Sequence, residues 1–311
     1  MITLDDIQLA APRIAPFIRH TPMLQASSLR HPVTAADLWL KLECLQPTGS
    51  FKVRGASNRL LTTPVEALRN GIVTASGGNH GLATARAASV AGVTANIFVP
   101  RSITEAKLAR LASWGAEVQV VGEVWDQANE QALLFAAEHQ AAYFHPFADP
   151  AVVAGQGTLG LEILAQLPDV EVILVAIGGG GLVAGIVTAI KALKPSVRII
   201  GIEPQGSPTL HASLAAQQVV RLPSVTTRVA TMACGRTEER VFELARQGLE
   251  EIVLVSDDEL LQAAQWLWFE LGLAADLSGA AAIAALRSGK LQFAAGTQVC
   301  ALVCGAGAEG L

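Results

Sequence analysis

Residues 172–193 read VILVAIGGGGLVAGIVTAIKAL, which is an apolar run, four glycines and a second apolar run. The first run has no polar interruption, as expected of a strand that is covered on both faces in a parallel sheet. The glycines favour a turn, and we predict a helix from Leu182 to Leu193. A strand, a glycine loop and a helix in succession form a βα unit, so this stretch indicates an α/β fold.

The same alternation of strand-like and helix-like segments continues on both sides of this stretch, which is typical of stacked βα units. We expect further strands near residues 38–42, 71–75, 96–99, 117–121, 198–202, 251–255 and 298–303. We expect further helices near residues 50–61, 81–91, 104–114, 123–139 and 157–167, with Ser50, Thr104, Asp257 and Ser278 as caps.

Two breaks in the pattern suggest how the chain divides into domains. The segments His145-Pro146-Phe147 and Asp149-Pro150 interrupt the alternation, and a second break falls near residues 64–71. We therefore predict a large domain of residues 1–70 and 148–311 and a smaller domain of residues 71–147. A chain of 311 residues is long enough for two such domains.

Composition excludes several classes of protein. The net charge of −5 argues against nucleic-acid binding, which needs a basic surface. Hydrophobic residues make up 51% of the chain and charged residues 16%, so we expect a well-packed or oligomeric protein, most simply a homodimer. The mean hydropathy is +0.41, but the four glycines interrupt the longest uncharged run, so we predict no membrane span.

The N-terminal residues and the cysteines point to a compartment. Acidic residues Asp5 and Asp6 stand where a signal peptide would be basic and then apolar. The four cysteines form no C-x-x-C pair and have no metal-ligand spacing with histidine. We therefore expect reduced thiols in a cytoplasmic protein.

The glycine loop is also a candidate binding site. Backbone N–H groups at a helix N-terminus attract anions, and Gly178 to Gly181 would let the backbone close around a phosphate. The loop lacks the G-x-G-x-x-G pattern and the G-K-[ST] of a nucleotide P-loop, which weakens the dinucleotide and ATP hypotheses. A plain tight turn is the alternative.

Two further segments carry polar groups at helix starts. Residues 48–56 read TGSFKVRGA, and Lys52 would lie in a first helical turn, where the helix dipole disfavours a cation and lowers its pKa. Residues 75–81 read ASGGNHG, where Ser76, Asn79 and backbone N–H groups suit a carboxylate. Taken singly, an ordinary surface lysine and a capped loop with a surface histidine explain these segments as well.

Together the three segments indicate one cofactor. Pyridoxal 5'-phosphate (PLP) needs an amine for its aldehyde, an anion site for its phosphate and a cradle for the amino-acid carboxylate. The chain resembles the fold-type II PLP enzymes, most closely the serine/threonine dehydratase (ammonia-lyase) and serine racemase group. The motifs that carry the resemblance are residues 42–56, 76–80, 154–158, 178–182, 201–204 and 303–305.

The resemblance implies a fold and an activity. It implies an α/β protein of two domains with parallel-type sheets flanked by helices, PLP in the cleft between them, and the tryptophan synthase β-like architecture. The expected reaction is β-elimination, which converts a β-hydroxy amino acid such as L-threonine or L-serine to a 2-keto acid and ammonia. The expected partner is this small amino-acid substrate.

The resemblance also implies roles for particular residues. Lys52 would bind PLP covalently and act as the base at the substrate Cα, with Phe51 beside the ring. Asn79 would bond the ring oxygen and Cys304 would face the ring nitrogen. The phosphate would be held by Gly178, Gly179, Gly180, Gly181 and Leu182. The substrate carboxylate would be bordered by Ser76, Gly78, Asn79 and His80.

Several features depart from the pattern of the group. The racemases carry a serine where this chain has Gly77, which favours elimination over racemisation. A cation site would start at Glu203, but its later carboxylate falls near Thr209, so the metal is unknown. The chain ends at Leu311, so we expect no regulatory domain and no feedback inhibition by isoleucine.

Four other functions stay open at this point. Within the same fold the chain could be an amino-acid racemase or a β-replacement synthase. From other classes it could be a non-catalytic small-molecule-binding protein or a dinucleotide-dependent dehydrogenase. Lys52 within its motif argues against a protein without catalysis.

Overall fold

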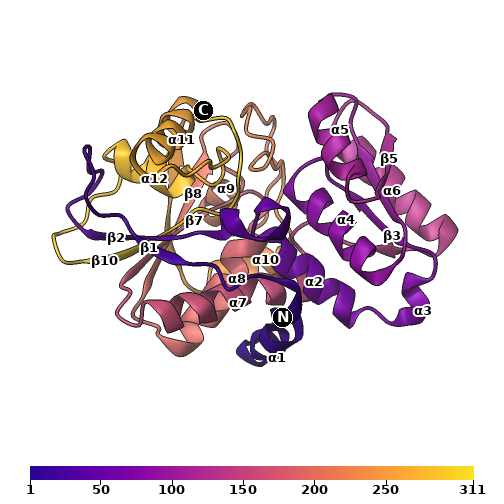
Figure 1. Cartoon of the computed structure of the whole chain (residues 1–311), viewed down its shortest axis with the longest axis horizontal. Helices are drawn as coiled ribbons and strands as arrows, with labels where there is room; N and C mark the ends of the chain where they lie inside the picture. The colour runs from indigo at the N-terminus through magenta and orange to yellow at the C-terminus, as the bar shows by residue number, and fades with distance from the viewer.

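The computed structural model describes all of residues 1–311 and contains two separate sheets (Figure 1). The larger sheet has six strands in the order β1-β2-β10-β7-β8-β9, and the smaller has four in the order β5-β4-β3-β6. Every pairing is parallel except β1 with β2. The parallel α/β class predicted from the glycine stretch is therefore confirmed.

The larger sheet lies between helices on both of its faces, with α7, α8 and α10 on one side and α11 and α12 on the other (Figure 1). Its strands are β1 (Met23–Gln25), β2 (Asp37–Lys41), β7 (Val172–Ala176), β8 (Arg198–Pro204), β9 (Leu249–Val255) and β10 (Gln298–Leu302). Its helices are α1 (Leu4–Ile14), α7 (Pro150–Gln166), α8 (Gly181–Leu193), α9 (Thr209–Ala215), α10 (Glu239–Ala245), α11 (Asp257–Leu271) and α12 (Ala281–Arg287). All residues of β7 are buried, as its uninterrupted apolar run predicted.

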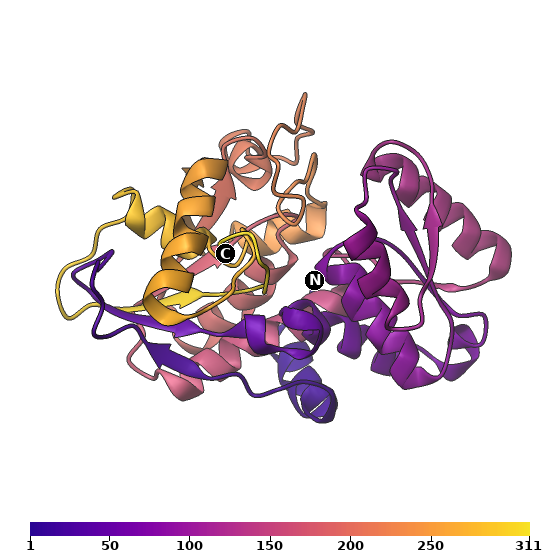
Figure 2. The same cartoon turned by 45° about the horizontal axis from the view of Figure 1, so that its top comes forward.

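The smaller sheet forms a second lobe, drawn in magenta in Figures 1 and 2. Its strands are β3 (Ile72–Ala75), β4 (Ala95–Val99), β5 (Glu117–Val120) and β6 (Ala142–Tyr143). Its helices are α3 (Val65–Leu68), α4 (Asn79–Ala91), α5 (Glu105–Ala112) and α6 (Trp125–His139). A hydrophobic core of its own, which includes Ile72, Ile97 and Leu111, packs between β3, β4, α4 and α5.

Helix α2 (Lys52–Thr62) lies where the two lobes meet, packed against α4 of the smaller lobe and α7 of the larger one (Figure 1). Short 3-10 turns precede it, η2 (Glu43–Leu45) and η3 (Pro47–Gly49), and a further one, η1 (Ala15–Phe17), follows α1. The position of α2 places its first residue, Lys52, at the junction of the lobes.

A buried ionic cluster fixes α2 to the larger lobe. The Arg54 guanidinium donates hydrogen bonds to Glu43 (2.7 Å) and Glu162 (2.7 Å), and Lys41 donates to Glu162 (2.6 Å). The Arg54 and Glu43 side chains are 1% and 0% exposed. The two cations balance the two carboxylates, which is the condition for burying such charges.

Three of the four predicted helix caps, Ser50, Asp257 and Ser278, are wrong. Phe51, not Ser50, precedes α2, and no side chain caps that helix. Ser256 caps α11 through a capping box, so Asp257 is its first residue. Ala280, not Ser278, precedes α12, because the Ser278 hydroxyl donates to Asp276 instead (2.6 Å). The predicted cap Thr104 is confirmed.

No helix of the chain is both long enough and apolar enough to cross a membrane.

Candidate active site

Lys52 is the first residue of α2 and is held between the lobes. Its Nζ donates a hydrogen bond to the Pro146 carbonyl (2.7 Å) and lies 5.2 Å from the centre of the Phe51 ring. Burial lowers the pKa of Lys52 to about 8. The sequence suggested a lowered pKa from the helix dipole, whereas the structure attributes it to burial. A larger share of this amine is therefore neutral near pH 7 than for an ordinary lysine.

The glycine loop presents a row of free donors. The backbone N–H groups of Gly178, Gly179, Gly180, Gly181 and Leu182 donate no hydrogen bond within the chain, and they stand at the N-terminus of the 13-residue helix α8. Such a row, together with the helix dipole, is an anion site.

The packing explains why the loop needs glycine. A Cβ on Gly179 would lie 2.3 Å from the Phe147 ring, and one on Gly181 would lie 2.3 Å from the Phe147 carbonyl oxygen. Gly180 adopts φ +92°, which side chains rarely tolerate. Because Phe147 follows Pro146, the segment that touches the glycine loop also holds Lys52.

A second helix N-terminus faces the same region. The N–H groups of Asn79, His80 and Gly81 at the start of α4 donate no hydrogen bond, and the Gly78 N–H donates to Ser76 Oγ (3.4 Å). These donors suit the carboxylate of an amino acid, as the sequence predicted for this loop.

The His80 imidazole does not belong to these donors. It is 2% exposed, and its Nε2 bonds the Phe144 carbonyl (3.0 Å). Burial, with the nearby charge of Lys52 as a further cause, lowers the pKa of His80 to about 3. The ring is therefore neutral and bound to the backbone, so His80 contributes its N–H group to this edge of the site.

Cys304 lies beside Phe51, although the sequence separates them widely. The Phe51 N–H donates to the Cys304 carbonyl (3.1 Å), and Ser50 forms a bridge with Gly305. The Cys304 thiol donates to Ser278 Oγ (3.8 Å). Burial, followed by the charge of Asp276, raises the pKa of the Cys304 thiol far above its usual value. This thiol is therefore neutral.

The residues present fit PLP. The half-buried Lys52 amine, with its lowered pKa, suits the aldehyde of PLP. The five free amides at the start of α8 suit its phosphate, and the three at the start of α4 suit the carboxylate of the substrate. The Ser50 hydroxyl, next to Phe51 in the chain, is buried without a hydrogen-bond partner. Buried polar groups without partners are rare and mark places where a ligand can bind.

The sequence missed two residues of this region. Asp276 accepts a hydrogen bond from the Asn79 amide (2.8 Å), and its only signal was being a lone acid in the apolar stretch 271–286. Thr231 lies against both loops, because added Cβ atoms on Gly78 and Gly178 would lie 3.7 Å and 3.0 Å from its atoms. Thr231 lies in the irregular segment between α9 and α10, where no periodic pattern marks a site.

Glu203 and its neighbours do not fit a cation. Its carboxylate accepts hydrogen bonds from the N–H groups of Leu210 (2.8 Å) and His211 (2.9 Å), and burial raises its pKa to about 8. The Thr209 hydroxyl donates to the Cys234 carbonyl. No cluster of three or more potential ligands among His, Cys, Asp and Glu lies here or elsewhere in the chain. We therefore derive no step through a metal.

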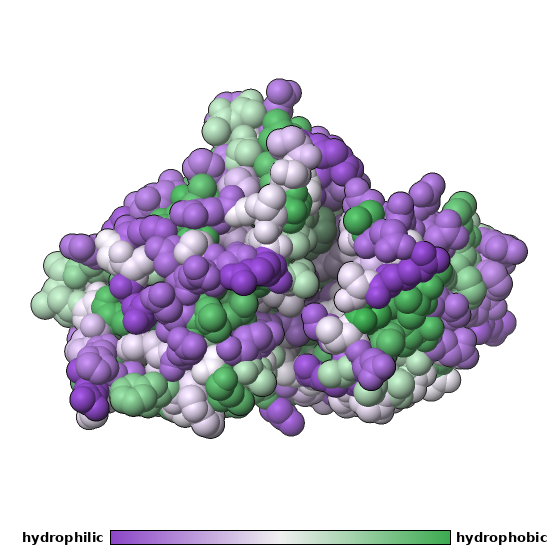
Figure 3. Space-filling view, turned by 90° about the horizontal axis from the view of Figure 1, so that it is seen from above, coloured by the Kyte–Doolittle hydropathy of each residue, from purple (hydrophilic) through white to green (hydrophobic).

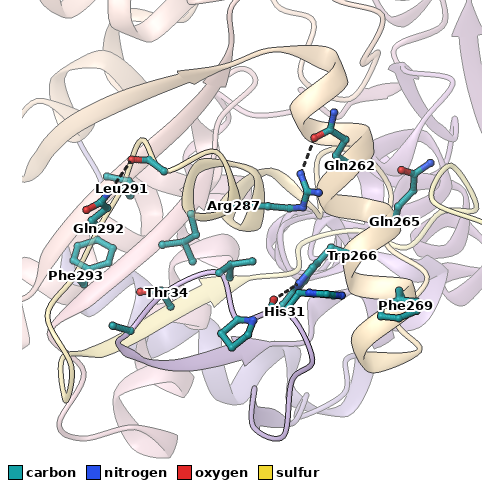
Figure 4. Close-up of a pocket in the computed structure, with 15 residues that line it drawn as sticks. His31, Thr34, Gln262, Gln265, Trp266, Phe269, Arg287, Leu291, Gln292 and Phe293 are labelled. Atoms are coloured by element: carbon teal, nitrogen blue, oxygen red, sulfur yellow. Dashed lines mark hydrogen bonds between the residues drawn. The ribbon is translucent and has the colours of Figure 1, made fainter.

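The surface is hollowed between the two lobes (Figure 3). A separate cavity of about 900 Å³ lies on the larger lobe, lined among others by His31, Trp266, Phe269 and Arg287 (Figure 4). None of the candidate site residues lines this cavity. We place the chemistry between the lobes, because the lysine and both rows of free amides lie there.

Comparisons with known proteins agree with this site. Residues 14–305 match the family described as pyridoxal-phosphate dependent enzyme. The chain is 39% identical over 286 residues to the L-threonine ammonia-lyase of Thermotoga maritima. This match covers 92% of this chain and 71% of that protein. Maize serine racemase superposes with a TM-score of 0.92 at 31% identity, covering 98% of this chain and 93% of that one. A threonine deaminase from T.th. superposes with a TM-score of 0.89 at 35% identity, covering 98% of both chains.

Proposed function

The chain belongs to the pyridoxal-phosphate-dependent enzyme family, and on that basis we propose that it is an ammonia-lyase of fold type II. The reaction is the β-elimination of a β-hydroxy amino acid, L-threonine or L-serine, to a 2-keto acid and ammonia. The observation that carries the proposal is the placement of Lys52, which is half-buried at the junction of the lobes and donates to the Pro146 carbonyl, next to the Phe147 that contacts the glycine loop. The relatives named L-threonine ammonia-lyase support the same reaction.

The residues of the chain divide the work. When bound, PLP supplies an aldehyde for an amine and a ring that accepts negative charge from the substrate Cα. Lys52 holds that aldehyde and moves the Cα proton, which its lowered pKa permits near neutral pH. The N–H groups of Asn79, His80 and Gly81 bind the carboxylate and so orient the substrate. Leu182 and the four glycines before it hold the phosphate.

Cys304 determines how long negative charge stays at the substrate. Its thiol is neutral, because burial raises its pKa, so it does not stabilise a positive charge on the ring nitrogen as a carboxylate would. With PLP bound, the ring beside this neutral thiol would take up less of the negative charge formed at Cα, which would favour prompt loss of the β-hydroxyl. This supports elimination rather than transamination.

A racemase of the same fold is the second candidate, because the maize serine racemase is similar over 98% of this chain. Racemisation needs a proton donor on each face of the substrate Cα. Lys52 serves one face, and Gly77 has no proton to give at the position where the racemases have a serine. We therefore place elimination first.

The test is a substrate panel. Purified protein loaded with PLP is incubated with L- and D-serine, L- and D-threonine and bulkier 3-hydroxy amino acids, and release of keto acid and ammonia is measured. Keto acid from L-serine or L-threonine supports the proposal. No keto acid from any member, with the PLP chromophore present, would contradict it.

The domain division and the assembly also belong to this proposal. We propose domains of residues 1–70 with 148–311 and of residues 71–147, supported by the strands of the smaller sheet, which all fall within residues 72–143. Helix α3 lies just before this boundary, yet its Leu68 packs in the core of the smaller lobe. We propose a cytoplasmic homodimer, supported by four free cysteines and by exposed apolar side chains such as Phe269, which is 62% exposed. Light scattering of the purified protein measures the assembly.

A further inference from the structure

Asp276 is a buried carboxylate without a cation. It lies between α11 and α12, is 6% exposed and forms no ion pair within 4.0 Å. Its oxygens accept hydrogen bonds from Asn79 Nδ2 (2.8 Å), Ser278 Oγ (2.6 Å) and the Gly279 N–H (2.6 Å). Burying a lone carboxylate is costly, so a residue of this kind calls for an explanation beyond packing.

The backbone around Asp276 leaves room for this carboxylate. A Cβ on Gly305 would lie 2.4 Å from Asp276 Oδ2, and one on Gly307 would lie 2.7 Å from Asp276 Cα. The Asp276 N–H donates to the Gly305 carbonyl (3.0 Å). The carboxylate is therefore held in one position, against the residues that follow β10, which include Cys304 and Gly305.

On one side, Asp276 decides which way the Asn79 amide points. Asp276 Oδ2 accepts a hydrogen bond from Asn79, so the Asn79 group that faces Asp276 is the NH₂ and not the carbonyl. One of the two N–H groups is used by Asp276. The second N–H of the same nitrogen is left to donate to another acceptor, and its hydrogen bond is polarised by the carboxylate behind it.

On the other side, Asp276 decides where the Cys304 proton points. The Ser278 hydroxyl donates its hydrogen bond to Asp276, so the Ser278 oxygen is left to accept a hydrogen bond from the Cys304 thiol. The single thiol proton is then directed to Ser278, and the sulfur offers only lone pairs elsewhere. Burial, followed by the negative charge of this carboxylate, raises the pKa of the Cys304 thiol.

We infer that Asp276 is a positioning residue that sets the donor and acceptor directions of the two polar side chains expected to contact the PLP ring, Asn79 directly and Cys304 through Ser278. The inference rests on the proposed function, because it needs PLP in this site. It adds a residue from the α11–α12 connection that is hydrogen-bonded to Asn79 of the smaller lobe and is linked through Ser278 to Cys304 of the larger lobe.

A double-mutant cycle on the PLP affinity of the apoprotein tests the Asn79 arm. Asp276→Asn should weaken PLP binding about 10- to 100-fold, the range for a hydrogen bond to a charged group. In an Asn79→Ala background the same change should cost severalfold less, because Asp276 acts on the ring partly through Asn79, and the remaining loss reports its route through Ser278 and Cys304. Asp257→Asn is the matched control, since Asp257 also accepts from a hydroxyl and a backbone N–H but lies at the start of α11.

The Cys304 arm has a readout that does not need PLP. Alkylation of Cys304 by iodoacetamide in the apoprotein, followed by mass spectrometry, should be severalfold faster in Asp276→Asn and in Ser278→Ala than in the original protein. Cys300, buried in β10, is the internal reference, and its labelling should not change. Ser278→Ala keeps this arm testable if Asp276→Asn does not fold.

Additive losses of PLP affinity in the cycle, or unchanged labelling of Cys304 in both variants, would overturn the inference. Failure of the proposed function looks different. In that case the original protein would bind no PLP, or Lys52→Ala would keep the chromophore, whatever residue stands at position 276.

Discussion

At the scale of single residues, Lys52 carries the clearest expectation. Lys52→Ala should abolish the visible chromophore and all turnover, because Lys52 is the lysine that donates to Pro146, next to the Phe147 that contacts the glycine loop. The unfolding temperature of the apoprotein should stay close to that of the original, since the change removes an unfavourably buried amine from a site and not from a hydrophobic core. Absorption spectra, turnover and thermal unfolding measure the three effects. A chromophore that persists would contradict the assignment.

The lowered pKa of Lys52 predicts how fast the apoprotein takes up PLP. Only the neutral amine attacks the aldehyde. Below a pH of about 8 Lys52 in the folded protein is mostly protonated, so the rate should rise with pH up to about 8 and then level off. An ordinary lysine, with a pKa of about 10.4, would let the rate keep rising well above that. Stopped-flow absorbance across the pH range measures the rate, and a rise that continues toward pH 10 would contradict the prediction.

The sequence predicts site residues that stand in a local motif, and it does not predict residues that reach the site only through contacts distant in the sequence. Lys52, Asn79 and the glycines each stand in a motif at a helix start, so local rules find them. Local rules predict Ser278 as a helix cap, but its hydroxyl donates a hydrogen bond to Asp276 instead. Only the three-dimensional structure brings Asn79 and Asp276 together.

At the scale of elements, the glycine loop can be tested without touching the lysine. Gly179→Ala should weaken PLP affinity by at least about tenfold, because its Cβ would lie 2.3 Å from the Phe147 ring and either Phe147 or the row of amides must move. Gly235→Ala is the matched control, since the nearest atom to its Cβ would lie at 3.8 Å. Titration of each apoprotein with PLP measures the affinity. An unchanged affinity in Gly179→Ala would place the phosphate elsewhere.

The ionic cluster behind α2 predicts a large stability effect. Glu43→Gln leaves Arg54 and Lys41 with a single carboxylate, and an uncompensated buried charge costs about 3–5 kcal/mol of the free energy of unfolding. Glu250→Gln removes the exposed partner of Arg198 and should cost no more than about 1 kcal/mol. Urea denaturation of both variants measures the difference. Equal, small losses would show that Arg54 does not need Glu43.

Most elements were predictable from sequence, and the misses have a local cause. Helix α7 was expected to begin near residue 157 but begins at Pro150, with Asp149 as its cap. The dipeptide Asp149-Pro150 interrupts the alternation of strands and helices and so suggests a domain boundary, yet proline is also favoured at the first position of a helix. The two-residue strand β6 escaped notice because it is too short to show a period.

At the scale of the whole molecule, the expected outcome is elimination with little racemisation. L-serine or L-threonine should give keto acid far faster than the D-enantiomer, because only Lys52 offers a proton at the substrate Cα. Chiral chromatography of the remaining substrate, alongside release of keto acid, measures both rates in one reaction. D-amino acid that forms at a comparable rate would reveal a second acid.

The structure refines what a serine at position 77 would do. A Cβ on Gly77 would lie 2.8 Å from Ile103 and 3.4 Å from Val99, so it points toward apolar side chains of the smaller lobe. Gly77→Ser alone should therefore not give racemisation, and Gly77→Ser with Ile103→Ala is the stronger test. The same chiral assay separates the two variants.

The place of β10 in the larger sheet affects when the protein can become active during its synthesis. Residues 298–302 pair on one side with residues 37–41 and on the other with β7, so a strand that is made long after both of its neighbours is inserted between them. Lys52 is translated long before Asp276 and Cys304. A nascent chain cannot form the expected contacts to the PLP ring until residue 304 has been made and β10 has entered the sheet. Assembly of the site is tied to the slowest, most non-local step of folding.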